Sequence, residues 1–259
     1  MQNSSYSALF GALTQERRLD IIANNLANVN TAGFKGDRLA FQDTFTRYAH
    51  DLQNPNYSVR DQVAWPRSYV LAQPRIAERV IDLTQGPLET TGNPLDLAVA
   101  GEGFFRLQTP QGEMLSRGGG FQLSPDGFVV DAQGNRLLGE GGPIQIPQGA
   151  RDIVITGDGL LSADNEAVDR IPLVRVEDPK ALEKMGANLL RIRPESGAAP
   201  LPAEDAEVVQ GAVEKPNVEV VTEMVNMIET MRAYEAYQKI ITGTFEQDKK
   251  LITEVGSVR

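Results

Sequence analysis

Apolar residues near both ends of the chain recur at alternating spacings of four and three, which is typical of helices that pack along one narrow face. This pattern predicts one helix over residues 4–30 and another over 218–252. In the second helix, where Gln238 is the polar exception, the repeating positions are Val220, Met224, Met227, Met231, Tyr234, Ile241 and Phe245. In the first helix they are Leu19, Ile22, Leu26 and Val29.

A narrow apolar face on a terminal helix needs a partner. A helix of the length predicted at the front of the chain would extend about 40 Å, and it is too thinly apolar to be stable alone in water. We therefore interpret the repeating positions as an assembly seam, through which the two terminal helices pair in a coiled-coil-like bundle and become ordered when neighbours cover them. The alternative is a pair of ordinary amphipathic helices folded against one compact body.

Between the two helices the pattern changes to short β-prone runs, such as 95–99 and 152–155, separated by turns rich in Gly and Pro. Turn signals at this spacing predict antiparallel strands in a sandwich or irregular barrel. The expected fold class is therefore α+β. The expected organisation is a helical core domain formed by 1–35 and 217–259, a connecting arm over 36–74, a β-rich body over 75–193 and an exposed linker over 194–216.

Composition narrows the function classes. The chain has 259 residues, of which 41% are hydrophobic, enough for a substantial core. Its formal net charge of -10 argues against nucleic acid as a partner, because such binding depends on Lys and Arg. It has no cysteine, no apolar run long enough to cross a bilayer, and no basic start with an apolar stretch like that of a secretory signal peptide. We expect a soluble chain without membrane insertion.

The sequence contains few residues arranged in patterns typical of catalytic sites. The only histidine is His50, which we interpret as a solvated residue of the arm, and Gly101-Glu102-Gly103 lacks the third glycine of a dinucleotide loop. We therefore expect no enzyme activity, catalytic residue, cofactor or metal site. The alternative is a secreted β-rich hydrolase or glycan-binding module that uses acids of the turns, and its candidates are Asp126, Asp131, Asp158, Asp164 and Glu166.

Asparagines cluster where the first helix is expected to end, although Asn is a poor helix former. We interpret them as register-fixing side chains in a packed bundle, with Gly33 in the left-handed conformation that ends a helix. The alternative is simple fraying toward the end of the helix. This segment resembles the amino-terminal signature of the bacterial flagellar axial proteins, the family of rod and hook subunits. The matching residues are Asn24, Asn25, Leu26, Asn28, Thr31, Gly33 and Phe34. Segments 82–105 and 217–239 resemble that family's central and carboxy-terminal blocks, in the same order.

This resemblance implies a structural subunit of the flagellar basal-body rod, which assembles helically with copies of itself and other rod proteins and transmits torque. It also implies a periplasmic location, reached unfolded through the flagellar type III export apparatus without a cleaved signal peptide, and no cofactor. Within the family, the chain length and the single β body favour a place in the proximal rod. The alternative within the family is a distal rod or hook subunit.

Overall fold

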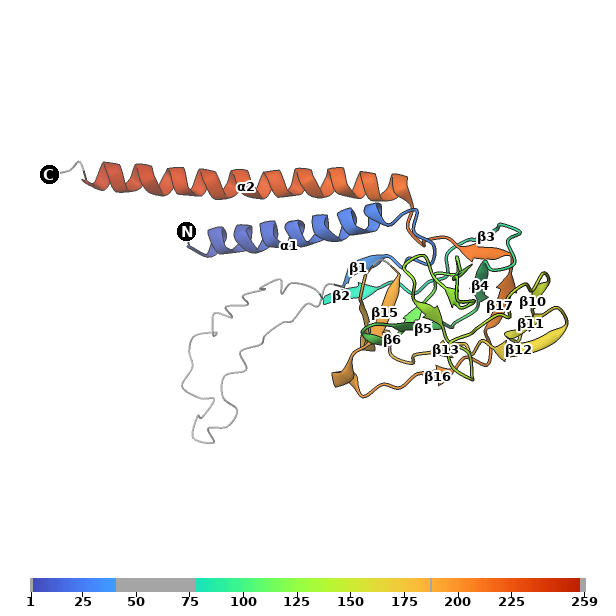
Figure 1. Ribbon diagram of the computed structural model, residues 1–259. Coiled ribbons are helices and arrows are strands. Elements are labelled where there is room, and N and C mark those ends of the chain that lie inside the picture. Colours follow the sequence, from blue (N-terminus) through green and yellow to red (C-terminus); the bar gives the residue numbers. More distant parts are fainter. Residues whose placement is uncertain (1, 41–77, 187, 257–259) are drawn as a thin grey trace, which may run out of the picture. The chain divides into compact units, whose positions relative to one another are not determined.

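The computed structural model describes residues 2–40, 78–186 and 188–256. Within these residues the chain forms two long helices and mainly antiparallel β-sheets (Figure 1), so the predicted α+β class is confirmed. The chain divides into two compact units. The described parts of 1–20, 39–79 and 228–259 form one, and 21–38 with 80–227 form the other, which contains most of the strands.

Helices α1 (Gln2–Ala27) and α2 (Val220–Gly256) lie side by side and run in opposite directions (Figure 1). The contact in the first unit includes Gly11, where an added Cβ would overlap the ring of Tyr237. Ala8 and Ala12 are buried on the same side of α1, so small side chains line the face that carries Gly11. Contact between the terminal helices is therefore present, and a coiled-coil form of their pairing stays a prediction.

The first helix ends three residues earlier than expected. Asn28 donates from Nδ2 to the backbone oxygen of Asn24 at 2.9 Å, an alternative bond for a helix-end carbonyl that Asn side chains readily make. A turn follows, in which the Thr31 amide donates to the Asn28 oxygen at 3.0 Å. Gly33 then adopts φ +70°, the left-handed conformation predicted for it.

The largest sheet has the strand order β14-β15-β6-β5-β9-β8-β7. Its central hairpin alternates as a half-buried strand should, because Phe105, Leu107 and Thr109 point inward while Arg106 and Gln108 do not. The strands are β5 (Phe105–Thr109), β6 (Gly112–Ser116), β7 (Gln122–Leu123), β8 (Val129–Val130), β9 (Arg136–Leu137), β14 (Leu182–Lys184) and β15 (Leu189–Ile192).

Smaller sheets complete the structure. The pairs β13-β16, β17-β4 and β18-β3 and the triplet β10-β11-β12 are antiparallel, and β1 pairs with β2. Two of these pairs join strands from early and late parts of the chain. The strands are β1 (Asp37–Ala40), β2 (Glu78–Ile81), β3 (Leu88–Thr90), β4 (Leu97–Ala100), β10 (Ile153–Ile155), β11 (Leu160–Ala163), β12 (Glu166–Arg170), β13 (Val174–Arg175), β16 (Leu201–Pro202), β17 (Glu207–Gln210) and β18 (Ala212–Glu214).

The core of the body consists of two clusters of buried side chains. The larger one contains Phe105 and Phe121, whose rings meet edge to face at 5.5 Å between centroids, together with aliphatic residues from β4, β9 and β11. The smaller one is built around Phe104, Leu182 and Leu190. The body therefore has the apolar interior expected from the β-prone runs.

The stretch 194–216 differs from the exposed linker that we expected. It contains the short 3₁₀ helix η3 (Pro194–Ser196) and strands β16, β17 and β18, which pair with strands of the body. Its Pro residues and acidic cluster suggested a linker, but Glu207–Gln210 form a strand whose partner lies more than a hundred residues away. Most of the expected arm, including His50 and Trp65, lies outside the described residues. Neither helix has a stretch long and apolar enough to span a membrane in the part of the chain that was searched.

Candidate functional site: anchored helix roots and exposed helix faces

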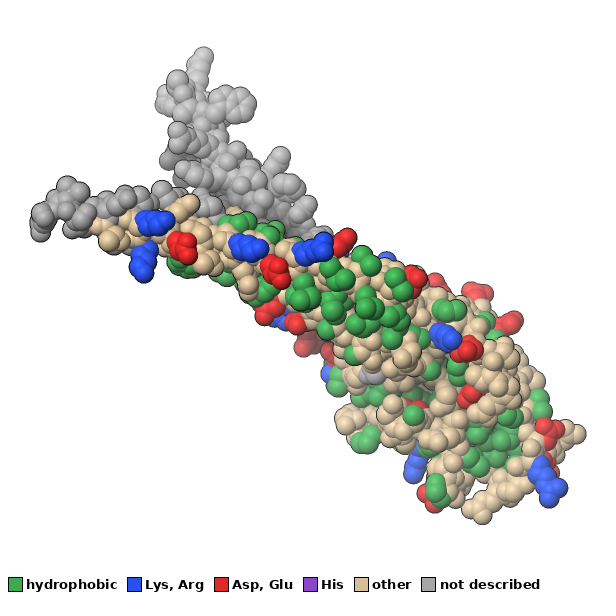
Figure 2. Space-filling view, turned by 90° about the horizontal axis from the view of Figure 1, so that it is seen from above, with side chains coloured by type: hydrophobic (Ala, Val, Ile, Leu, Met, Phe, Trp, Pro, Cys, Tyr) green, Lys and Arg blue, Asp and Glu red, His purple; other side chains and the backbone are tan. Residues whose placement is uncertain are grey.

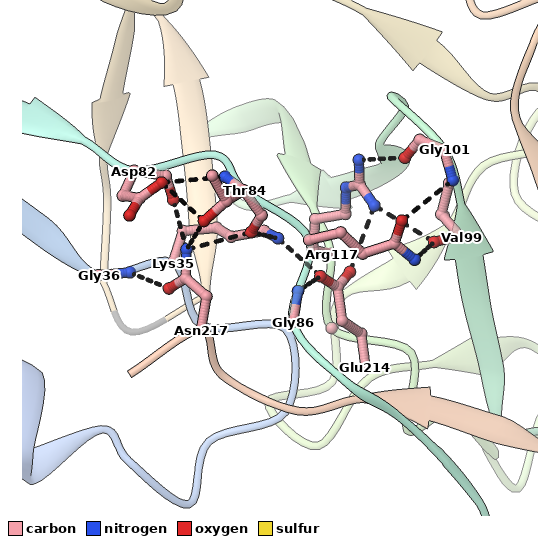
Figure 3. A network of polar contacts seen from close by, with 12 residues as sticks. Lys35, Gly36, Asp82, Thr84, Gly86, Val99, Gly101, Arg117, Glu214 and Asn217 are labelled. Atoms are coloured by element: carbon pink, nitrogen blue, oxygen red, sulfur yellow. Dashed lines mark hydrogen bonds and ion pairs between the residues drawn. The ribbon is translucent and has the colours of Figure 1, made fainter. Parts of the chain in front are cut away.

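Three charged side chains form a buried ion cluster between the segments that follow α1 and precede α2. We call Lys35, Arg117 and Glu214 the root cluster; their side chains are 2%, 4% and 0% exposed. Lys35 Nζ lies 2.6 Å from Glu214 Oε1, and Arg117 Nη1 lies 3.3 Å from Glu214 Oε2 (Figure 3). One carboxylate thus compensates two buried cations.

Backbone groups satisfy most of the remaining polar atoms of the root cluster. The Gly86 amide donates to Glu214 Oε1 at 2.8 Å, and Lys35 Nζ also donates to the Thr84 oxygen at 2.8 Å. Arg117 Nη2 donates to the Gly101 oxygen at 2.7 Å. Strand β18 places Glu214 directly between these groups, and the hydrogen bonds fix the cluster in one arrangement.

The electrostatic balance of the cluster depends on Glu214. Burial lowers the pKa of Lys35, and the hydrogen bond that Lys35 donates to Glu214 opposes this shift. Burial also lowers the pKa of Arg117, again against the attraction of Glu214. Removing the carboxylate would leave two buried positive charges close together, which is strongly destabilising.

Two asparagine amides hold the same segment from both sides. Asn25 accepts from the Asp37 amide at 2.9 Å and donates to the Asp37 oxygen at 3.0 Å. Asn217, three residues before α2, accepts from the Gly36 amide at 2.7 Å and donates to the Asp82 oxygen at 2.8 Å (Figure 3). The chain leaving α1 and the chain entering α2 are therefore tied to each other and to the body.

Segment 33–37 is buried throughout, which is unusual for a connection after a helix. Gly33 is required there, because an added Cβ would overlap the backbone of Arg117 and Gly118. Lys184 completes the anchor. Its ammonium group lies 4.1 Å from the ring centroid of Phe34 and 2.8 Å from Asp37 Oδ2.

Only part of this anchor could be predicted from the sequence. The family signature includes Asn25, Gly33 and Phe34, but a register role between helices was expected for the asparagines. Asn25 instead pairs with the backbone of Asp37 in the body unit, because this amide can satisfy both groups of one buried peptide. Asn24 and Asn28 lie near the helix end, where Asn28 donates to the Asn24 oxygen. The root cluster was missed because Lys35 and Glu214 are 179 residues apart.

The predicted seam positions do not share one environment. On α2, half-buried positions are Met227, Tyr234 and Ile241, whereas Val220, Met224, Met231 and Phe245 are exposed, Phe245 by 68%. On α1, Ile22 is buried and Leu19, Leu26 and Val29 are half-buried. Figure 2 shows hydrophobic side chains gathered at the surface over the first turns of α2. Their role as an assembly seam stays a prediction.

Three of the five turn acids that we considered for catalysis are engaged in local structure. Asp131 accepts from the Asn135 amide at 2.8 Å, and Asp164, with φ 50°, accepts from the Asp152 amide at 3.0 Å. Asp158 forms an ion pair with Arg170, and its pKa is lowered by the Thr156 hydroxyl first and by Arg170 second. These contacts are typical of carboxylates that shape turns.

Comparison with known proteins gives matches along most of the chain. Residues 6–35 match the family model described as flagella basal body rod protein, 98–163 match the flagellar hook protein FlgE/F/G D1 domain, and 209–254 match the flagellar basal body rod FlgEFG protein C-terminal. A flagellar basal-body rod protein FlgF from Caulobacter vibrioides is 35% identical over the full length of both chains. A FlgG protein from Agrobacterium fabrum is 33% identical over 92% of this chain and 94% of its own. A FlgF protein from Mesorhizobium japonicum is 29% identical over 99% of both.

Proposed function

Since this chain belongs to the family of flagellar basal-body rod proteins, we propose that it occupies the proximal part of the rod and assembles helically with copies of itself. It is a structural subunit of the rod, located in the flagellar basal body, where it assembles with other rod proteins. The family is structural and is not an enzyme family. The observation that carries the proximal assignment is the full-length match to a FlgF protein, without overhang on either chain.

The helices of this chain are suited to continuous assembly. Helix α2 contacts α1 at Tyr237 and Gly11, while the first turns of α2 expose apolar side chains to solvent in a single chain. In a helical assembly each copy covers its neighbour through a head-to-tail contact, which allows growth without closure. We infer that the two helices pair in a coiled-coil-like manner and that neighbouring copies complete their cover.

Transmission of torque requires that the helices cannot rotate freely against the body. The root cluster, Asn25 and Asn217 fix the chain segments that leave α1 and enter α2 within the body unit, through buried hydrogen bonds and ion pairs. These anchored segments support a role in a drive shaft.

The proposed location is the periplasmic part of the flagellum, reached through the flagellar type III export apparatus without a cleaved signal peptide. A chain without cysteines can pass an export channel and refold without forming disulfides. Late segments such as β17 and β18 must pair with the early strands β4 and β3, so the body can be completed only after most of the chain has emerged.

The variant Met231→Asp tests the assembly role. It places a charge on the exposed face of α2, and we expect the folded body to persist while rod incorporation and swimming are lost. Met185→Asp, at an exposed position of the body, is the matched control and should swim normally. Far-UV circular dichroism of the purified chain and the subunit content of isolated basal bodies are the measurements. Normal incorporation of Met231→Asp would contradict the assembly role. If a labelled copy of the natural chain were found at the distal end of the rod, the proximal assignment would be contradicted.

A further inference from the structure

One short segment near the end of the β body pairs with strands from its beginning. We call residues 207–217 the clasp; they contain β17 and β18 and end at Asn217, three residues before α2. Strand β17 pairs with β4, and β18 pairs with β3. Within the described residues, β3 and β4 have no other strand partner in their sheets. The clasp therefore completes two early strands at once.

Side chains at the end of the clasp contact the same early part of the chain (Figure 3). Glu214 contacts Lys35 and Arg117, which are 179 and 97 residues away in sequence. The side chain of Asn217 accepts a hydrogen bond from the Gly36 amide, 181 residues away. The clasp therefore holds the segment that follows α1 on the body.

Other strands of the body pair with near neighbours in sequence. Two residues separate β5 from β6, and five separate β7 from β8. Across the first of these hairpins, Arg106 and Glu113 form an ion pair 7 residues apart, whereas Glu214 and Lys35 are 179 apart. Because the chance that two chain positions meet falls roughly as the 3/2 power of their separation, the distant encounter is roughly 100-fold rarer. Local hairpins are therefore expected to form before the clasp closes.

Charge opposes docking of the segment after α1 before the clasp arrives. This segment packs against the backbone of Arg117 and Gly118, since an added Cβ on Gly33 would overlap both. Docking it there buries Lys35 and Arg117, whose side chains are 2% and 4% exposed in the folded body. Two buried cations without a carboxylate are strongly unfavourable, so Glu214 has to arrive in the same step. The root cluster therefore makes closure cooperative.

We propose that the clasp closes last in folding and anchors the segment after α1 and the segment before α2 to the body in one step. Before closure the local hairpins are formed, while 33–37, β3 and β4 remain open. The functional meaning of this order rests on the proposed export route. A chain that emerges with its amino terminus first cannot anchor α1 until Glu214 has followed, so the body stays open during most of the passage.

Hydrogen-exchange pulse labelling during refolding tests this order on the full natural chain. The purified chain is diluted from urea, labelled after different times and analysed by mass spectrometry of its peptides. We expect amides of β5, β6 and β8 to become protected first. Amides of β3, β4, β17 and β18 should become protected together and at least about 10-fold more slowly. Simultaneous protection of both groups, or protection of β4 before β17, would overturn the proposal.

Two buried valines provide a matched pair of variants. Val208 on β17 is 4% exposed, Val129 on β8 is 1% exposed, and both belong to the larger core cluster. Val129→Ala should slow the early protection step by about fivefold, whereas Val208→Ala should leave that step unchanged within about twofold. An early step slowed equally by both variants would contradict the order. The measurement on the natural chain needs neither variant, so it decides the order even if one of them does not refold.

Glu214→Gln tests the coupling through charge. In native-state exchange, the amides of 33–37 and of the clasp should lose protection together, by at least about 100-fold. Glu89→Gln, which changes an exposed ion pair on β3, is the control and should alter their exchange by less than about fivefold. Loss of protection in only one of the two segments would refute the coupling. These measurements use the purified chain and do not depend on the rod role, which Met231→Asp tests separately in cells.

Discussion

Replacement of Glu214 by Gln removes the negative charge of the root cluster and replaces one carboxylate oxygen, which accepts from Arg117 Nη1 at 3.3 Å, with an amide group that can only donate. Gln has a similar shape, and its amide oxygen can still accept the Gly86 hydrogen bond, which is 2.8 Å long in the natural chain. What is lost is the compensation of Lys35 and Arg117, whose side chains are 2% and 4% exposed. The variant therefore tests the loss of charge compensation, together with one hydrogen bond of Arg117, in a fully buried site.

The expected loss is about 4 kcal/mol of unfolding free energy, because removal of one partner from a buried ion pair costs about 3–5 kcal/mol. For a unit of this size, such a loss lowers the melting temperature by about 8–16 °C. The measurement is urea unfolding followed by far-UV circular dichroism. Glu89→Gln is the control, since Glu89 pairs with Lys215 on the neighbouring strand but both side chains are 52% exposed, and such pairs contribute about 0–1 kcal/mol.

The loss of stability in Glu214→Gln should depend on pH, and the pKa of Lys35 sets the direction of this dependence. Burial already lowers the pKa of Lys35, and without Glu214 the opposing hydrogen bond is gone, so the pKa of Lys35 falls further. A folded state that binds fewer protons than the unfolded state gains stability as pH rises. The deficit of Glu214→Gln should therefore be larger at low pH and shrink as the pH rises through the lowered pKa of Lys35. A loss below about 1 kcal/mol, or a deficit that grows with pH, would refute the account of the root cluster.

Two glycines provide further predictions with matched controls. Gly33→Ala should lower the unfolding free energy of the body by more than about 3 kcal/mol, since backbone atoms block the new methyl group. Its control is Gly134→Ala, which also lies at positive φ but has open space around it. In the same urea experiment this control should lose only about 1–2 kcal/mol of unfolding free energy. Gly11→Leu should lower the temperature at which half of the helical signal is lost, because the new side chain must displace Tyr237. Gly243→Leu should raise this temperature, because the new side chain meets no neighbour and Leu is a better helix former than Gly. Equal effects within either pair would contradict the packing described.

The helices and the α+β class could be predicted because their signals are local. Residues close in sequence determine both signals, namely the spacing of three and four along α1 and α2 and the short β-prone runs between turns. The bounds were less accurate where Asn28 offered the chain a competing hydrogen bond. The linker assignment failed at β17 and β18, because strands of three or four residues are recognisable mainly through partners distant in sequence.

The functional residues were predicted only in part, for a related reason. A lysine at 35 and a glutamate at 214 look like surface charges in the sequence, and only their burial beside each other shows their role. The heptad-like pattern of α2 predicted an apolar face but could not tell which neighbour covers it. Within this chain, buried Thr230 and half-buried Tyr237 belong to the side toward α1, while Met224 and Met231 remain exposed.

Methionine oxidation in the free chain and in the assembled rod tests the central claim most directly, namely that neighbouring copies cover the exposed apolar side chains on the first turns of α2. Met224 and Met231 are 51% and 48% exposed and should react quickly with peroxide in the free chain. Met114, which is 2% exposed, should be protected in both states, and Met185 on the body is a reference for an exposed thioether. The account predicts that Met224 and Met231 become protected in isolated basal bodies. Oxidation of both residues at the same rate in the rod as in the free chain would contradict it.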